Sequence, residues 1–226
     1  MKKERLVLLP GYDGNGKKTF AKLRKLLEKQ YQVITIDYPY FSNPEKQYGL
    51  DELVEYVDGY ISDKAILLGF SMGGFVASRY AFLHPEKTNK LVLVSSSTVP
   101  TLDKNLENIL GWANKLLQNR LLAWGLTKLF LASNLKNFPL PKPGKGFDPK
   151  MGYAVFGSLA KVMTEAKLEN IRVDKLAILF EDDKSFPAEI YRPKLSKQGF
   201  ATKILKTGGH AEKPDYWEKV AKGLLR

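Results

Sequence analysis

Short hydrophobic runs alternate along this chain with segments of helical periodicity. Six runs have the length and β-rich composition of strands: 5–9, 32–37, 64–70, 90–95, 175–181 and 201–205. Five segments have helical spacing: 17–29, 50–60, 72–83, 189–198 and 213–225. Near-continuous apolar runs such as 33–36 are typical of strands that helices cover on both faces. The alternation predicts an α/β fold with a doubly wound, mainly parallel sheet of about six strands. Its functional site is expected at the carboxyl ends of the strands.

The stretch 101–170 interrupts this alternation, because it is far longer than one crossover helix. Apolar residues at i, i+3 and i+4 spacing predict two short amphipathic helices in its first half. A proline-rich loop, 139–146, cannot be helical, and a helical run over about 150–168 returns the chain to the core. We expect one domain over residues 1–226 that carries a helical insertion at 101–170.

The composition is that of an ordinary globular protein, with 44% hydrophobic and 27% charged residues. The chain has no uncharged run of 18 apolar residues, so no segment is expected to span a bilayer. The basic residues 1–5 precede only four apolar residues before Pro10, too few for an export signal. Cysteine is absent, which excludes disulfides, a thiolate nucleophile and a cysteine zinc site. We therefore expect the protein in the cytoplasm.

The formal net charge of +12 raises the question of an anionic partner. The 36 basic residues comprise 29 Lys and only 7 Arg, whereas bases and phosphates are recognised mainly by the rigid guanidinium fork of Arg. A solvated lysine-rich surface is the preferred interpretation, and an acidic protein or anionic substrate is the alternative. A nucleic acid partner is not expected.

The run Gly69-Phe70-Ser71-Met72-Gly73-Gly74 lies between a predicted strand and a predicted helix. In that context, Gly-x-Ser-x-Gly predicts a sharp turn that presents the serine as a nucleophile. Glycine is needed two positions to either side, because side chains there would collide across the turn. Backbone N–H groups at the start of the following helix can stabilise negative charge beside Ser71. A glycine-rich turn with an incidental serine is the alternative.

A serine nucleophile needs a base, normally a histidine that a carboxylate orients. Of the two histidines, His84 precedes a proline at a helix end and is interpreted as structural. His210 lies in a glycine-rich loop after the last predicted strand, which makes it the predicted base. Three acids follow the fifth strand, and Asp183, the furthest into the loop, is best placed to orient His210. We assign Glu181 and Asp182 to solvation of that loop.

At this point the chain resembles the α/β-hydrolase superfamily. The resemblance covers essentially the whole chain and rests on four separated matches: Leu8-Leu9-Pro10-Gly11-Tyr12-Asp13-Gly14, the elbow with its helix, Glu181-x-Asp183-x-x-x-Pro187 and Gly208-Gly209-His210. The order Ser71, Asp183, His210 is also that of the family's nucleophile, acid and base.

The resemblance implies an oxyanion hole formed by the backbone N–H groups of Tyr12 and Met72, with Pro10 at a position where the family usually has histidine. It implies that the sheet lacks the family's first two antiparallel strands, and that the insertion is a lid. Aromatic residues then become candidate substrate contacts, with ordinary packing as the alternative: Trp112, Trp124, Phe130 and Phe186.

The resulting hypothesis is acyl transfer from a carboxylic ester or thioester through an acyl-enzyme on Ser71, with no metal or organic cofactor. The resemblance is to small carboxylesterases, including those that act on methyl esters carried by acyl carrier protein. Since carrier proteins are acidic, the positive net charge is a physical reason to consider a carrier-bound substrate. Two alternatives stay open. One is a lyase of the same fold, similar to menaquinone-pathway enzymes, in which the triad abstracts a proton. The other is a non-catalytic basic module that binds an acidic protein.

Overall fold

A parallel sheet of six strands forms the centre of the computed structural model, which describes residues 3–100 and 149–225. The strands are β1 (Glu4–Leu9), β2 (Tyr31–Thr35), β3 (Ala65–Phe70), β4 (Thr88–Val94), β5 (Asp174–Phe180) and β6 (Ala201–Leu205). They lie in the order β2-β1-β3-β4-β5-β6, and every neighbouring pair is parallel. The predicted α/β class and parallel sheet are confirmed.

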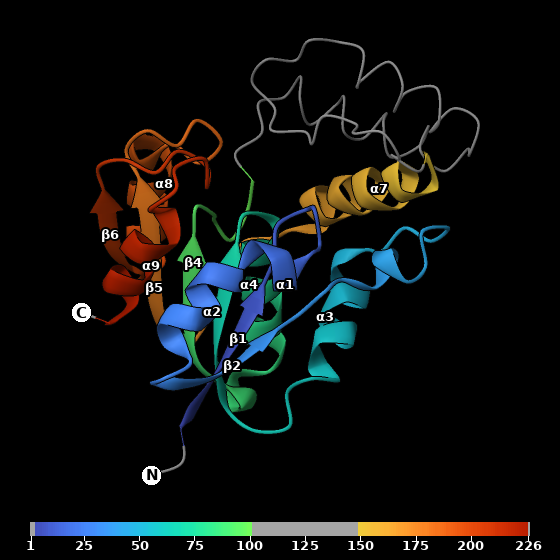
Figure 1. Ribbon diagram of the computed structural model, residues 1–226, viewed down its shortest axis with the longest axis horizontal. Helices are drawn as coiled ribbons and strands as arrows, with labels where there is room; N and C mark the ends of the chain where they lie inside the picture. Colours follow the sequence, from blue (N-terminus) through green and yellow to red (C-terminus); the bar gives the residue numbers. More distant parts are fainter. Residues whose placement is uncertain (1–2, 101–148, 226) are drawn as a thin grey trace.

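Helices cover both faces of this sheet (Figure 1). The described helices are α1 (Gly16–Thr19), α2 (Ala21–Leu27), α3 (Leu50–Asp58), α4 (Met72–Leu83), α7 (Pro149–Glu165), α8 (Ala188–Lys197) and α9 (Tyr216–Leu225). Apolar residues of α2 and α9 pack on one face, in front in Figure 1, whereas α3, α4 and α8 pack on the other. Side chains of β1 alternate between the two cores: Leu6 and Leu8 face one, and Val7 and Leu9 face the other. This burial on both sides explains the continuous apolar strands.

The helix expected over 17–29 is two helices, α1 and α2, which are separated at Phe20. Phe20 has the non-helical backbone angles φ −101° and ψ 11°, and its side chain is completely buried. Its ring packs edge-on against Trp217 of α9, with 5.1 Å between the ring centroids. Packing onto α9 thus accompanies a break that helical periodicity alone does not reveal.

Helix α7 corresponds to the helical run expected over 150–168, and it lies near the carboxyl ends of the strands (Figure 1). Three contacts join it to the start of α3 and to the segment before that helix. The Glu165 carboxylate accepts the N–H of Leu50 at 2.5 Å. The Ser158 hydroxyl accepts the N–H of Tyr48 at 2.8 Å, and Gly157 lies against Gln47. The rest of the predicted insertion, 101–148, lies outside the described residues, so the division of the chain into one domain with an insertion stays a prediction.

No helix within 3–100 or 149–225 is both long and apolar enough to cross a membrane. The expected cytoplasmic location stays a prediction.

Candidate active site

Ser71 lies in a sharp turn between β3 and α4, with φ 52° and ψ −124°. The two flanking glycines are required by close backbone approach. A Cβ atom on Gly69 would lie 2.4 Å from the Gly73 carbonyl oxygen, and one on Gly73 would lie 2.2 Å from the Leu9 carbonyl oxygen. The motif therefore has the strand–turn–helix context that its sequence predicts.

Three hydrogen bonds hold the backbone of Ser71 in this unfavourable conformation. Its N–H donates to the Val94 carbonyl oxygen at 3.1 Å, and its carbonyl oxygen accepts the Gly74 N–H at 2.9 Å. The hydroxyl of buried Ser96 donates to the Ser71 carbonyl oxygen at 2.6 Å. Gly74 leaves room for Ser96, because a Cβ atom there would lie 2.0 Å from the Ser96 Oγ. The last residue of β4, Val94, and Ser96 just after it thus support the turn.

His210 joins Ser71 to Asp183 through its two ring nitrogens. Its Nε2 lies 2.9 Å from the Ser71 Oγ, and its Nδ1 lies 3.0 Å from the Asp183 Oδ2. The imidazole side chain is 10% exposed, and the Asp183 side chain is fully buried. An ionised Asp183 can only accept, so Nδ1 carries the proton and Nε2 is left to accept from the serine hydroxyl. This is the hydrogen-bonding order that a serine nucleophile requires.

Several donors converge on the Asp183 carboxylate. Its Oδ1 accepts the N–H groups of Ser185 at 2.8 Å and Phe186 at 3.0 Å. Burial alone would raise the pKa of Asp183. The hydrogen bond and charge of His210, with the Phe186 N–H and the Ser95 hydroxyl, outweigh burial and lower that pKa below its usual value. The carboxylate is therefore held in its ionised form.

Ser95, which supports Asp183, was not identified from the sequence. It follows β4 with φ 45°, and its Oγ accepts the hydroxyl of buried Tyr216 at 2.7 Å. Its own hydroxyl is directed at Asp183. Its place in the run Ser95-Ser96-Ser97, at the carboxyl edge of a central strand, was the available signal.

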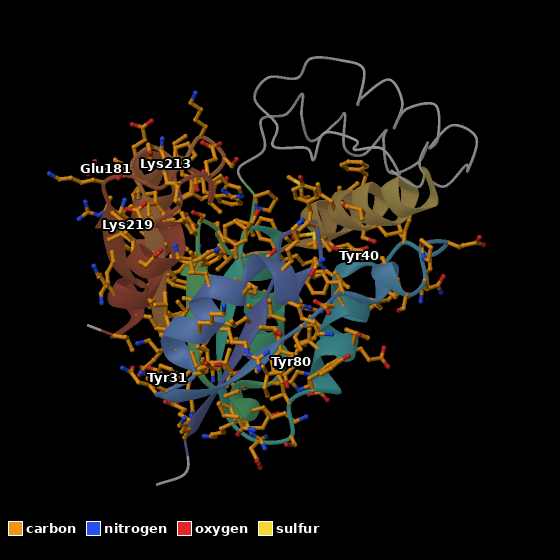
Figure 2. The ribbon with its side chains drawn as sticks, in the orientation of Figure 1. Tyr31, Tyr40, Tyr80, Glu181, Lys213 and Lys219 are labelled. Carbon is orange, nitrogen blue, oxygen red and sulfur yellow. The ribbon has the colours of Figure 1, made fainter. Side chains whose placement is uncertain are left out.

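The loop that carries His210 is held by Asp182. The Asp182 Oδ1 accepts the N–H groups of Gly208 at 2.9 Å and Gly209 at 2.8 Å. The assignment of Asp182 to loop solvation is therefore wrong: although the residue is exposed, its carboxylate accepts hydrogen bonds from the backbone of another loop. Glu181 agrees with that assignment: its side chain is exposed, and Figure 2 shows it at the outer edge near α8.

The loop after β1 approaches the nucleophile from the other side. A Cβ atom on Gly11 would lie 3.4 Å from the Ser71 Cβ, so the Tyr12 amide that follows is close to the serine. Met72 is the first residue of α4, where an N–H group has no acceptor within the helix. The Tyr40 hydroxyl donates to the Tyr12 carbonyl oxygen at 2.6 Å. These are the two backbone donors expected from the sequence, and their role in an oxyanion hole stays a prediction.

Comparison with known proteins identifies the family. A family model described as the alpha/beta hydrolase fold matches residues 4–192. This chain belongs to the α/β-hydrolase fold family. The sheet, the elbow after β3 and the site at the carboxyl edge of the sheet all agree with that membership.

Individual members of the α/β-hydrolase family match part of the sequence or the whole fold. The pimeloyl-[acyl-carrier protein] methyl ester esterase of Aeromonas hydrophila is 38% identical over 96 residues, which cover 41% of this chain and 37% of that protein. The protein of the same name from Citrobacter koseri is 35% identical over 41% of this chain and 36% of its own length. The matched part thus spans little more than a third of these relatives.

Solved α/β-hydrolase structures resemble the whole chain. An esterase from Exiguobacterium antarcticum has a TM-score of 0.68 at 20% identity, covering 99% of this chain and 91% of that one. A thermophilic esterase from Thermogutta terrifontis has a TM-score of 0.71 at 17% identity, covering 99% and 89%. At these identities the likeness supports the fold alone.

The other residues considered from the sequence lie at different distances from Ser71 in this α/β-hydrolase structure. His84 ends α4, at the opposite end of that helix from Ser71, and packs against Tyr80, which Figure 2 labels in the lower part of the molecule. Phe186 is buried and stacks on the His210 ring with 5.7 Å between the centroids, and Phe70 stacks on it at 5.1 Å. Contact of Phe186 with a substrate stays a prediction. The other three aromatic candidates lie outside the described residues: Trp112, Trp124 and Phe130.

Within the described part of the chain, no group of three or more His, Cys, Asp or Glu side chains is arranged to hold a metal ion.

Proposed function

We propose that this α/β-hydrolase is a serine hydrolase that cleaves a carboxylic ester or thioester through an acyl-enzyme on Ser71. The observation that carries the proposal is the hydrogen-bonded series from Ser71 through His210 to Asp183. It is supported by the esterase names of the relatives that match part of the chain.

In the first half of the reaction, the Ser71 Oγ forms a bond to the acyl carbon while His210 Nε2 takes the hydroxyl proton. The carbonyl oxygen gains negative charge and accepts the N–H groups of Tyr12 and Met72. The bond to the leaving group then breaks, and His210 returns the proton to the departing oxygen or sulfur. Asp183 keeps Nδ1 protonated and stabilises the transient imidazolium.

In the second half, a water molecule takes the place of the leaving group. His210 removes a proton from this water as its oxygen attacks the acyl carbon, and the same two backbone donors hold the oxyanion. The bond to the Ser71 Oγ breaks, the serine regains its proton from His210, and the carboxylic acid leaves. Every proton is accounted for by one imidazole, so the proposed chemistry needs no metal or organic cofactor.

The proposed substrate is an acyl ester on a carrier protein. Two observations support it: the partial relatives are named for esters of acyl carrier protein, and the chain carries a net charge of +12. Acidic carriers would associate faster with a basic protein, and added salt would weaken this effect.

Covalent trapping tests the mechanism. A fluorophosphonate is expected to add one mass adduct on Ser71, and p-nitrophenyl esters of graded chain length are expected to be hydrolysed. Ser71→Ala should abolish labelling and lower kcat by more than about 10³-fold. Labelling without turnover of any ester would favour a lyase. Absence of labelling, together with retained salt-sensitive binding to a polyanion, would favour a non-catalytic module.

A paired substrate tests the carrier. The same acyl methyl ester is offered free and attached to acyl carrier protein, at low and high salt. We expect a larger kcat/KM for the carrier-bound ester and a decline of that advantage as salt rises. Equal values at both salt concentrations would contradict a carrier-bound substrate and leave the esterase mechanism intact.

A further inference from the structure

Two neighbouring acids after β5 contact the same loop at different points. Asp183 accepts the ring Nδ1–H of His210. Asp182 accepts the backbone N–H groups of Gly208 and Gly209, at 2.9 and 2.8 Å, through one oxygen atom. The second contact fixes the peptide groups that lead directly into His210.

The loop has a conformation that needs such support. Gly209 has φ 58°, and Ala211, a residue with a side chain, has φ 65°. Gly208 is pressed against β5, because a Cβ atom there would lie 2.2 Å from the Phe180 ring. Left-handed backbone at a non-glycine residue costs about 1–3 kcal/mol and persists only where surrounding contacts hold it.

In the same turn, the carbonyl group of Gly208 forms its hydrogen bonds within the loop. The Gly208 carbonyl oxygen accepts the N–H groups of Glu212 at 3.2 Å and Lys213 at 3.3 Å. The N–H side of Gly208 and Gly209 is bonded to Asp182 across the gap between two loops. Asp182 thus connects the backbone of the turn before His210 to the sheet edge that carries Asp183.

We propose that Asp182 is a positioning residue, whose carboxylate holds the backbone of residues 208–209 so that the His210 ring reaches both Ser71 and Asp183. This inference rests on the proposed function, in which His210 is the base. The His210 ring has little freedom to move, because its Nε2 lies 2.9 Å from the Ser71 Oγ and its Nδ1 lies 3.0 Å from the Asp183 Oδ2. A displacement of about 1 Å in such a group can cost about 10²-fold in rate.

The matched test uses three variants and p-nitrophenyl butyrate. Asp182→Leu keeps the branched arrangement of heavy atoms and removes the acceptor, and it is expected to lower kcat about 10²-fold while KM stays nearly constant. Asp182→Asn keeps an oxygen acceptor and is expected to restore most of kcat, because a neutral acceptor retains part of the hydrogen-bond strength. Glu181→Leu, which changes an exposed side chain one residue earlier, is expected to behave as the wild type.

Three kinetic results would overturn the proposal. The first is an Asp182→Leu variant whose kcat and KM both match those of the wild type. The second is a rise in KM at unchanged kcat, which would place Asp182 at the substrate instead of at the loop. The third is a Glu181→Leu variant as slow as Asp182→Leu, because the effect would then come from the charge of the loop.

Amide hydrogen exchange tests the same contact without relying on activity, and its wild-type measurement does not depend on the folding of a variant. The Gly208 and Gly209 N–H groups are expected to exchange slowly in the wild-type protein, and faster in Asp182→Leu. Rapid exchange of both groups in the wild type overturns the proposal. If the wild-type protein hydrolyses no ester, the proposed function fails by itself, and the exchange rates still decide whether Asp182 holds the loop.

Discussion

Two buried tyrosines, two residues apart, offer a controlled test of how the loop after β1 is held. Tyr40 and Tyr38 are 0% and 1% exposed. The Tyr40 hydroxyl donates to the Tyr12 carbonyl oxygen at 2.6 Å, and Figure 2 shows Tyr40 between α7 and α3. The Tyr38 hydroxyl is buried and has no hydrogen-bond partner among the described residues. Replacing either residue by phenylalanine removes one oxygen atom from the same core.

The expected effects differ in sign as well as size. Tyr40→Phe removes a donor from the part-buried Tyr12 carbonyl, which is expected to cost about 1–3 kcal/mol of unfolding free energy. For a chain of this length, each kcal/mol lowers Tm by about 2–4 °C, so Tm should fall by roughly 2–12 °C. Tyr38→Phe removes an unsatisfied polar group and is expected to leave Tm unchanged or raise it slightly.

Ester hydrolysis should also be affected by Tyr40→Phe and not by Tyr38→Phe. Loss of an oxyanion donor typically costs about 10²–10³-fold in turnover. Tyr40 acts through the Tyr12 carbonyl and only shifts the proposed donor, so Tyr40→Phe is expected to lower kcat by less than that range. Thermal unfolding and ester hydrolysis are measured on both variants. Equal loss of stability in Tyr38→Phe and Tyr40→Phe would refute the reasoning, because the lost volume rather than the hydrogen bond would then explain it.

Three further predictions concern the acid and the elbow. Asp183→Asn is expected to lower kcat on p-nitrophenyl esters by on the order of 10³–10⁴-fold, because the amide favours the wrong imidazole tautomer; Glu181→Gln serves as the control. The lowered pKa of Asp183 stabilises the native state above the ordinary aspartate pKa of about 3.9, and this contribution is lost as the pH falls through the lowered value. The difference in unfolding free energy between wild type and Asp183→Asn should therefore shrink as urea titrations move from about pH 6 to about pH 3. Gly74→Ala would place a Cβ atom 2.0 Å from the Ser96 Oγ, and overpacking should cost about 1–3 kcal/mol in urea unfolding. Gly59→Ala, whose Cβ atom would meet only a carbonyl oxygen at 3.4 Å, should cost nothing.

The elements of the fold could be predicted because each depends on local pattern. Strands buried on both faces read as continuous apolar runs, and α4 begins and ends where its motif and the Leu83-His84-Pro85 sequence predict. The break at Phe20 could not be predicted in this way. The break coincides with contact to Trp217, nearly two hundred residues later, and helical periodicity contains no information about that contact.

The same distinction applies to the site. Ser71 and His210 could be proposed from sequence because a motif marks one and the scarcity of histidine marks the other. Asp182, Ser95 and Tyr40 could not, because each contacts a group in a loop that follows a different strand. Parallel strands bring their carboxyl ends together, but the sequence does not state which polar side chain on one loop meets which backbone group on the next.

Backbone strain gives an independent reason to regard these loops as one functional unit. Within the described ranges, the residues with side chains and positive φ are Ser71, Ser95 and Ala211. They are the proposed nucleophile, the serine that supports the proposed acid, and the residue directly after the proposed base. Each such conformation costs about 1–3 kcal/mol, so a protein keeps it only where local contacts compensate. Here the compensation comes from Ser96, Tyr216 and Asp182, each of which bonds to one of the three loops. A preorganised site requires strained backbone in the loops that hold the triad, together with polar contacts from neighbouring elements that offset the strain. A turn with an incidental serine does not explain why two other loops at the same site also contain strained residues.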